Sequence, residues 1–290
     1  MKDITDVIWT EERVPNRWKK GMIFRLPKKG ILQHCENWRG ITLLPIISKV
    51  LSSITISRMR DGVEAKLREE QAAYVRGRGT TEHIFTLRNI IEQSLEWQTS
   101  LYVHFVDFEK AFDSIHRESL WTIMKSYGIP PKIINIVKAF YDDFECAILD
   151  DDGDITEWLK IKTGIKQGCN ISGFLFLLVI DFVMTRALRQ DSTGLRWKFT
   201  SKLEDLDFDD DVALLSSSKE EHTQTKTNRV TEEEERVGLK VNIKKCKLLR
   251  LNARNKEPFM IKGQEIEDLD KFVYLGTTVS NVGGTEELRT

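Results

Sequence analysis

The chain has 290 residues, of which 40% are hydrophobic and 31% are charged, and its net charge is −1. These values are typical of a soluble globular protein with room for about two domains. The net charge excludes a basic surface over the whole protein, so any binding of nucleic acid must depend on local patches of lysine and arginine.

The start of the chain and its longest apolar run carry no targeting signal. Met1–Ile4 begins no apolar signal region. The run Phe174–Ile180 is interrupted by Asp181 and is far shorter than the roughly 20 residues of a membrane span. The four cysteines are widely separated, match no zinc spacing and are typical of free thiols in a reducing compartment. We therefore expect an intracellular protein, nuclear or cytoplasmic, without a membrane partner.

The first predicted elements are a strand and two helices. Gly21–Leu26 is strand-like and leads into Pro27–Gly30, a turn signal that contains two lysines. A helix follows, and its apolar residues at helical spacing should pack it onto a core: Ile46, Ile47, Val50, Leu51 and Ile54. Thr80 or Thr81 is predicted to cap a second helix, which carries one apolar stripe of Ile84, Leu87, Ile91 and Leu95.

The middle of the chain begins with a buried strand that ends in an acid. Leu101–Val106 is apolar and β-prone, and Asp107 follows it directly before a helical segment. Two helices are predicted next, one over Arg117–Tyr127 and one opened by Pro130 and Pro131. Residues 146–149 and 158–161 are predicted to form a hairpin.

A glycine-bearing loop, 164–173, then opens the helix Phe174–Leu188, which is apolar nearly all round and should be buried. A further helical segment, Lys219–Arg236, contains Val230 as its one apolar residue and barely shows the stripe that a docked helix needs.

Between these two helices, an acidic cluster runs straight into the apolar segment Val212–Leu215. Neighbouring residues of a strand point to opposite faces, so Asp210 and Asp211 can converge only at the tight turn of a hairpin. Two adjacent carboxylates repel, and one takes up a proton unless a divalent cation shares them. Oxygen ligands of this kind suit Mg²⁺. The alternative is a solvated acidic turn. Together with Asp107, the pair supplies three carboxylates for two metal ions and an in-line displacement at phosphorus.

The carboxylate strand, the glycine loop and the acidic hairpin, in this order, make a resemblance specific. From about Trp9 to Gly284 the chain resembles the reverse transcriptases of non-LTR (LINE-like) retrotransposons, the type often encoded beside an endonuclease. The resemblance implies an α+β right-hand polymerase fold, with fingers over 1–99 and an antiparallel palm sheet backed by helices over 100–265. Residues 266–290 are then a primer-grip hairpin and the start of a thumb connection. We expect the thumb and the endonuclease to lie outside this stretch of sequence.

The resemblance also implies RNA-directed DNA synthesis with an RNA template, a DNA primer, deoxynucleoside triphosphates and two Mg²⁺ ions, or Mn²⁺ as an alternative. By motif match, the catalytic residues are Asp107, Asp210 and Asp211, with Lys245 as a general acid, and Phe108 joins the carboxylates at the metals. The residues implied to bind the nucleotide are Lys28, Arg39, Phe112, Gln167 and Gly168. Those implied to contact template or primer are Arg76, Arg78, Tyr274, Leu275 and Gly276.

The chain departs from the family pattern at several positions. The segment Gln71–Thr80 matches one that usually reads Gln-x-Gly-Phe followed by Arg-Ser, with Ala73 and Gly79 as departures. Asn170 and Gly173 replace prolines, and Asp209 stands where the family usually has alanine. Two alternatives therefore stay open. One is an RNA-dependent RNA polymerase, against which Phe112 argues, and the other is a catalytically impaired remnant that at most binds nucleic acid.

Overall fold

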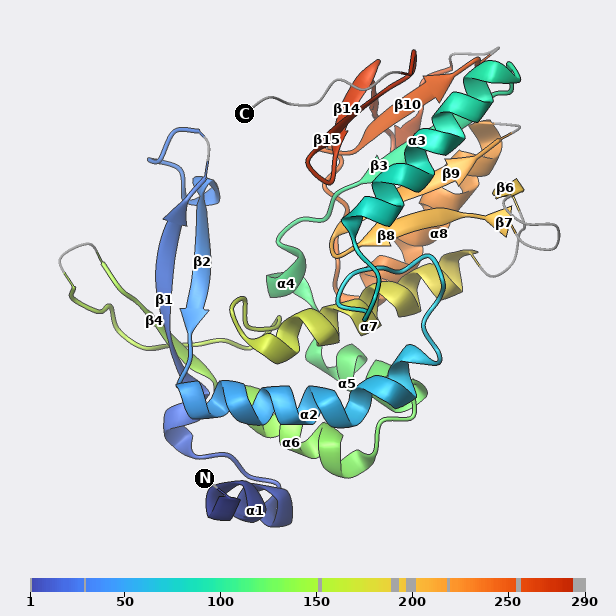
Figure 1. Cartoon of the computed structure of the whole chain (residues 1–290). Helices are drawn as coiled ribbons and strands as arrows, with labels where there is room; N and C mark the ends of the chain where they lie inside the picture. Colours follow the sequence, from blue (N-terminus) through green and yellow to red (C-terminus); the bar gives the residue numbers. More distant parts are fainter. Residues whose placement is uncertain are drawn as a thin grey trace. The chain divides into compact units, whose positions relative to one another are not determined.

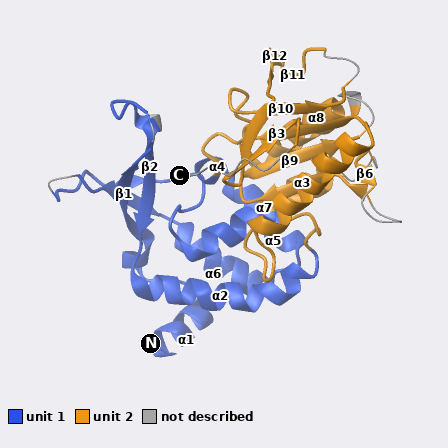
Figure 2. Cartoon of the chain, turned by 45° about the horizontal axis from the view of Figure 1, so that its top comes forward, with its two compact units in different colours: residues 1–66, 112–178 blue, residues 67–111, 179–290 orange. Residues whose placement is uncertain are grey.

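The computed structural model describes residues 2–28, 30–150, 153–188, 193–196, 202–217, 220–253 and 257–283. The second turn lysine (residue 29), the tip of the predicted 146–161 hairpin (151–152) and the end of the predicted thumb connection (284–290) lie outside the described residues. The chain divides into two compact units, each built from two stretches of sequence (Figure 2). Unit 1 comprises residues 1–66 and 112–178, and unit 2 comprises residues 67–111 and 179–290. Fingers and palm are functional terms rather than packing units, so the predicted partition stays a prediction.

Unit 1 combines a four-stranded sheet with helices (Figure 1). The strand order is β2-β1-β4-β5, with β1 antiparallel to β2 and parallel to β4. The predicted first strand and the predicted pairing of 146–149 with 158–161 are confirmed. Its elements are α1 (Lys2–Glu11), η1 (Asn16–Lys19), β1 (Lys20–Pro27), η2 (Cys35–Asn37), β2 (Trp38–Leu43), α2 (Ile46–Glu64), α4 (Ala111–Ser114), α5 (Arg117–Ser126), α6 (Pro131–Tyr141), β4 (Glu145–Ile148) and β5 (Leu159–Lys160).

Helix α2 forms as predicted and Leu51 is buried as expected, but the rest of the predicted apolar face is not the buried one. Ile46 is 80% exposed and Ile54 is 38% exposed. The helix instead buries small polar side chains together with Leu51, Met59 and Val63. Each buried hydroxyl donates to a backbone carbonyl of its own helix, as Ser52 does to Ser48 O at 2.9 Å, so burial leaves it satisfied. The isoleucine side lines an open groove of about 420 Å³.

Unit 2 is built on a five-stranded sheet with the order β13-β10-β3-β9-β8. Leu87 and Ile91 of α3 join the core cluster of Val103 and Phe105 on one face of β3. On the other face, His104 Nδ1 lies 2.8 Å from the Thr227 hydroxyl of α8. The elements of unit 2 are α3 (Thr80–Glu96), β3 (Leu101–Val106), β6 (Leu195–Arg196), β7 (Lys202–Leu203), β8 (Asp205–Phe208), β9 (Asp211–Ser216), α8 (Glu220–Val237), β10 (Lys247–Leu251), β11 (Met260–Ile261), β12 (Gln264–Glu265), β13 (Glu267–Asp268), β14 (Lys271–Tyr274) and β15 (Thr277–Ser280).

Helix α8 explains how a helix without an apolar stripe docks. Its buried face consists of threonines around Val230, together with Lys226 and Glu234. Lys226 pairs with Glu204 and donates to the Leu215 carbonyl, and Glu234 accepts from the Val241 N–H at 2.8 Å. The face is therefore polar by composition, and Lys226 and Glu234 find partners on burial, which a hydrophobic periodicity cannot detect. The cap predicted for α3 is also wrong, because the N-cap residue is Gly79 and Thr80 is the first helical residue.

Helix α7 (Asn170–Leu188) begins in unit 1 and ends in unit 2. It begins four residues earlier than predicted and ends at the predicted residue. By length and composition it is the one described helix that could cross a membrane. Within the protein, 78% of its most apolar 18-residue stretch is buried. Its predicted burial is confirmed.

Candidate active site

The carboxylates of unit 2 come together at one end of its sheet. Residues 208 and 211 are paired, so Asp209 and Asp210 form a two-residue hairpin turn between β8 and β9. Strand β3 pairs with β9 up to Val106 and Val212, and Asp107 and Asp211 stand one step beyond that pair. Neighbouring strands lie about 4.8 Å apart, so these two carboxylates are neighbours at the sheet end. The predicted hairpin turn is confirmed.

Burial and mutual repulsion shape the charges of this cluster. Partial burial raises the pKa of Asp211 to about 6, and the nearby carboxylates of Asp210 and Asp107 add to the shift. Burial also raises the pKa of Asp107, against the lowering effect of the Lys245 ammonium. Both carboxyl pKa values are thus raised chiefly by burial, with repulsion from neighbouring carboxylates added, and a bound divalent ion would offset both effects.

The oxygen atoms at this sheet end also suit a divalent ion. Asp107 Oδ1 is buried and accepts no hydrogen bond from the described residues, although it forms an ion pair with Lys245. Among those residues, no three His, Cys, Asp or Glu side chains form a complete metal site by themselves. Magnesium usually takes one or two protein carboxylates and fills its other positions with water and substrate phosphates. The carboxylates therefore fit an open site for a divalent ion that shares its coordination with a triphosphate.

Lys245 lies at the edge of the same cluster. Its Nζ is 3.4 Å from Asp107 Oδ1, and its side chain is 65% exposed. The backbone places it there, because Asn242 N donates to Asp107 O at 2.8 Å and Lys245 N donates to Asn242 O at 2.9 Å. Phe108 is buried and pairs with Val241 in the same short contact. The structure thus brings together the four residues predicted to be catalytic, all within unit 2.

Phe112 lies in unit 1, on the short helix α4. Its half-buried ring stacks on Phe176 of α7, with ring centroids 4.6 Å apart and an angle of 14° between the planes. This stacking holds the ring in one orientation, and part of its surface stays accessible. Packing and contact with a nucleotide are both compatible with this position.

The glycine loop of unit 1 lies against strand β2. Thr42 N donates to Gln167 O at 2.7 Å. Gly168 has φ +107°, and a Cβ there would lie 2.7 Å from the Thr42 carbonyl oxygen. The position therefore requires glycine both for its backbone conformation and for this close approach. The loop keeps a defined path without the two family prolines.

Lys28 and Arg39 lie on neighbouring strands of one hairpin in unit 1. Lys28 N donates to Asn37 O at 2.7 Å, directly beyond the last pair of β1 and β2, and Arg39 pairs with Leu26. Arg39 is exposed. The two residues thus lie near the same end of the hairpin.

The residues predicted to contact template and primer occupy different environments. The Arg78 guanidinium donates to three carbonyls of its own segment: Arg68 O, Glu69 O and Gln71 O. Arg76 is exposed. The hairpin of β14 and β15 forms as predicted and turns at Leu275 and Gly276, both with positive φ. Tyr274 is buried, and its hydroxyl donates to Leu206 O at 3.2 Å. Arg78 and Tyr274 thus have structural contacts that the sequence did not reveal.

One group next to the site was not predicted at all. Arg68 binds Asp205 at 2.7 Å, Asp181 at 3.3 Å and also Asp207, and all three carboxylates are almost fully buried. Burial and the neighbouring Asp205 raise the pKa of Asp207, against the effect of Arg68. Arg68 thereby ties α7 to β8, the strand that leads into the acidic turn. No motif or periodicity marks Arg68, because its partners lie more than a hundred residues away.

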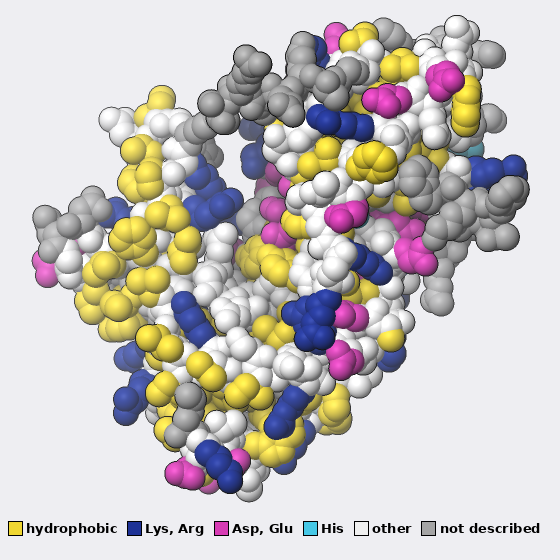
Figure 3. All heavy atoms as spheres, viewed as in Figure 1, with side chains coloured by type: hydrophobic (Ala, Val, Ile, Leu, Met, Phe, Trp, Pro, Cys, Tyr) yellow, Lys and Arg dark blue, Asp and Glu magenta, His cyan; other side chains and the backbone are white. Residues whose placement is uncertain are grey.

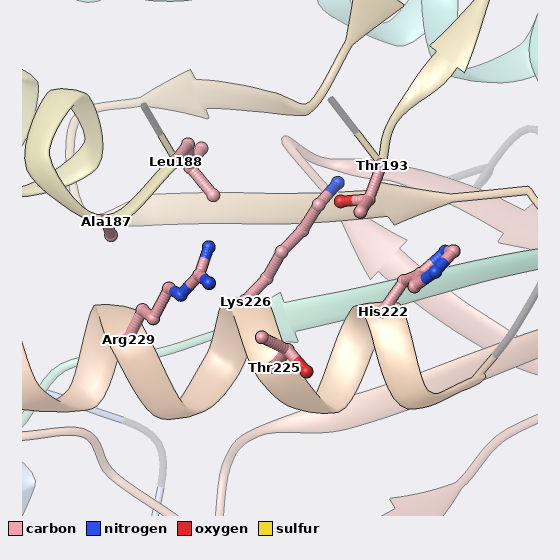
Figure 4. A pocket seen from close by; sticks show the side chains of 7 residues that line it. All are labelled: Ala187, Leu188, Thr193, His222, Thr225, Lys226 and Arg229. Carbon is pink, nitrogen blue, oxygen red and sulfur yellow. The ribbon is translucent and has the colours of Figure 1, made fainter. Parts of the chain in front are cut away.

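A separate cavity of about 230 Å³ lies in unit 2 between the end of α7 and one face of α8 (Figure 4). It contains none of the predicted site residues. Its lining includes His222, Lys226 and Arg229, and Lys226 is already engaged by Glu204.

Comparisons with known proteins agree with this geometry. The family model for reverse transcriptase (RNA-dependent DNA polymerase) matches residues 26–279. A type-1 retrotransposable element R2 polyprotein of Popillia japonica is 29% identical over 206 residues, which are 71% of this chain and 28% of that protein. The transposon TX1 149 kDa protein of Xenopus laevis is 28% identical over 63% of this chain and 14% of that protein. The chain thus spans only a minor part of these relatives' length.

Solved structures support the fold. Apo telomerase of Candida tropicalis superimposes with a TM-score of 0.66 at 14% identity, covering 99% of this chain and 53% of that chain. A form truncated from the C-terminal domain gives 0.64 at 16% identity, over 98% of this chain and 59% of that one. These likenesses show the right-hand polymerase fold, and the predicted α+β class is confirmed. With a family match over most of its length and carboxylates at the expected sheet end, this chain belongs to the reverse transcriptase family, on the non-LTR retrotransposon side.

Proposed function

We propose that this chain catalyses RNA-directed DNA synthesis, in which the primer 3′-hydroxyl attacks the α-phosphate of a deoxynucleoside triphosphate and pyrophosphate leaves. The observation that carries the proposal is the meeting of Asp107 with Asp210 and Asp211 at one sheet end, with Lys245 3.4 Å from Asp107. Reverse transcriptases generally use divalent metals. When bound, two Mg²⁺ ions supply activation of the hydroxyl and neutralisation of the triphosphate.

The residues of the chain take separate roles in this proposal. Asp107, Asp210 and Asp211 would hold the ions, and Phe108 would join them at the metal site. Lys245 donates a proton to the leaving pyrophosphate, because its exposed ammonium lies beside the carboxylates.

The other predicted residues would bind the substrates. Lys28 and Arg39 hold the triphosphate, with Arg39 suited to a bidentate grip. Phe112 faces the sugar, and the remaining contacts are made by Gln167 and Gly168 to the nucleotide and by Arg76, Arg78, Tyr274, Leu275 and Gly276 to template and primer.

Primer extension on poly(rA)/oligo(dT) with dTTP and Mg²⁺ tests the proposal. The protein should extend the primer, and Asp210→Asn should reduce extension by at least about 10³-fold, since it removes a ligand charge. Asp210 is exposed, so the variant should keep its melting temperature.

Asp143→Asn is the matched control, because it removes another exposed carboxylate, in unit 1, and should leave extension unchanged. Near-native extension by Asp210→Asn would contradict the site assignment. A folded, template-binding protein that extends nothing would favour the impaired remnant, and incorporation of UTP in preference to dTTP would favour an RNA polymerase.

A further inference from the structure

Tyr74 and Asp209 form a hydrogen bond between two segments that are far apart in sequence. The Tyr74 hydroxyl donates to Asp209 Oδ2 at 3.2 Å. Both residues have left-handed backbone conformations, with φ +57° for Tyr74 and φ +58° for Asp209. Residues other than glycine adopt this region rarely and keep it only where their surroundings enforce it. The two conformations place the two side chains against each other.

The backbone around Tyr74 explains how the position is enforced. Asp207 N donates to Glu70 O at 3.2 Å, and Ala72 N donates to Asp207 O at 3.0 Å. The segment is thus laid along β8 like an additional short strand. Arg68, at the start of the same segment, forms ion pairs with Asp205 and Asp207 of β8. The pairing of this segment with β8 therefore fixes the position of Tyr74 beside the acidic turn.

The charge at this turn makes the bond chemically relevant. Asp209 is followed directly by Asp210 and Asp211, so three successive carboxylates stand where the proposed function needs two. A third carboxylate there competes for the divalent ion and repels phosphate. Burial and the Asp209 carboxylate raise the pKa of the Tyr74 hydroxyl, so it remains a protonated donor at neutral pH. A carboxylate oxygen that accepts this hydrogen bond is less available as a metal ligand.

We propose that Tyr74 and Asp209 are a positioning pair, in which the Tyr74 hydroxyl holds the Asp209 carboxylate and so leaves the divalent-ion site to Asp107, Asp210 and Asp211. The proposal rests on the proposed function, since it concerns the same metal site. It does not make Tyr74 or Asp209 catalytic, because neither needs to touch the substrate.

A double-mutant cycle on divalent-ion binding tests the pair. Mn²⁺ binding is measured by electron paramagnetic resonance for the natural chain, Tyr74→Phe, Asp209→Ala and the double variant. Tyr74→Phe should change the Mn²⁺ dissociation constant by about fivefold to tenfold, because it releases a carboxylate beside the site. Asp209→Ala and the double variant should both lie within about twofold of the natural chain.

Thermal unfolding of the same four proteins separates positioning from packing. A lower melting temperature in Tyr74→Phe with unchanged Mn²⁺ binding would make Tyr74 a packing residue and overturn the proposal. The proposal would also be overturned if Tyr74→Phe changed Mn²⁺ binding equally in the natural chain and in Asp209→Ala. Absence of Mn²⁺ binding by the natural chain would overturn it as well. If Tyr74→Phe does not fold, Asp209→Asn replaces it. That variant keeps the acceptor and removes the charge, so the proposal requires that it bind Mn²⁺ within about twofold of the natural chain.

The Mn²⁺ measurement also separates this proposal from the proposed function. Coupling in Mn²⁺ binding by a protein that extends no primer would support the pair and contradict the polymerase proposal. Normal primer extension without coupling in Mn²⁺ binding would contradict the pair and support the polymerase proposal.

Discussion

The two units treat charge and hydrophobicity in opposite ways. Unit 2 buries Arg68 with three carboxylates beneath its acidic turn. Unit 1 instead exposes apolar side chains along one face of strand β1, where Met22, Phe24 and Leu26 are 37–45% exposed. Figure 3 shows hydrophobic side chains gathered over these strands. Since buried charge is costly unless paired, and exposed apolar surface stabilises little, the two regions should respond to substitution in opposite ways.

The two units fix their predicted site residues through different kinds of contact. In unit 2 the strand that carries the acidic turn is fixed by ion pairs and backbone bonds to the segment that begins at Arg68. In unit 1 the glycine loop is fixed by its backbone contact with Thr42. Charge substitutions should therefore damage unit 2, whereas apolar substitutions should damage unit 1 only at its interior.

The largest effect is expected from Arg68→Met. It leaves three buried carboxylates without their cation and should lower the free energy of unfolding by about 3–5 kcal/mol. Urea denaturation measures it. Arg186→Met removes an exposed arginine that pairs with Glu233 and should cost about 1 kcal/mol or less. Equal losses in the two variants would show that burial of the Arg68 cluster does not matter.

The pH dependence of the same variant sharpens this test. The folded-state pKa of Asp207 is already raised, chiefly by burial and Asp205, and removal of Arg68 raises it further. A raised carboxyl pKa gives stability that is complete below the unfolded pKa of about 3.9 and is lost as pH rises through the folded pKa. The deficit of Arg68→Met should therefore be smaller at pH 5 than at pH 8.

The next effect concerns Phe112 in unit 1. Phe112→Val should raise ribonucleotide incorporation relative to deoxynucleotide incorporation by about 10²-fold, because a ring that faces the sugar, as proposed, would fill the space of a 2′-hydroxyl and offer it no partner. Steady-state incorporation of both substrates measures the ratio. Phe140→Val is the control, since this buried ring stacks on Trp18 and should affect stability alone. A parallel loss with both substrates would make Phe112 a packing residue of the Phe176 stack.

A smaller effect separates the two faces of helix α2. Ile56 is 9% exposed, whereas Ile54 on the same helix is 38% exposed. Ile56→Ala should cost about 2–4 kcal/mol in the free energy of unfolding, and Ile54→Ala should cost about 1 kcal/mol or less. Denaturant titration of both variants checks the difference. The reverse order would restore the face that the sequence predicted.

The smallest effect is the pH response of the acidic turn. The pKa of Asp211 is raised to about 6, so without added metal its contribution to stability is lost as pH rises from about 4 to about 6. Adding Mg²⁺ should therefore raise the melting temperature by a few degrees at pH 7.5 and by less at pH 5. Thermal unfolding at both pH values measures this. Asp211→Asn should abolish the difference, and an unchanged difference would assign it to other groups.

Local patterns in the sequence determined the elements that carry the site. A strand that ends in Asp107, an acidic pair followed by Val212–Leu215, and a proline pair before α6 each specify local geometry through strand alternation and fixed φ angles. The hairpin of β8 and β9 and the start of α6 followed from these patterns. The convergence of Asp107 with the acidic turn also followed, because both lie at the ends of apolar strands that must pair.

Tertiary structure alone decided which partners the polar side chains find. Arg68 lies 113 residues from Asp181 and 139 from Asp207, and no local spacing encodes such contacts. The face that α2 buries and the polar face of α8 were settled in the same way, because hydroxyl, carboxyl and ammonium groups are buried wherever the folded chain supplies their hydrogen bonds. Periodicity measures the hydrophobicity of a face, whereas burial depends on what lies opposite it.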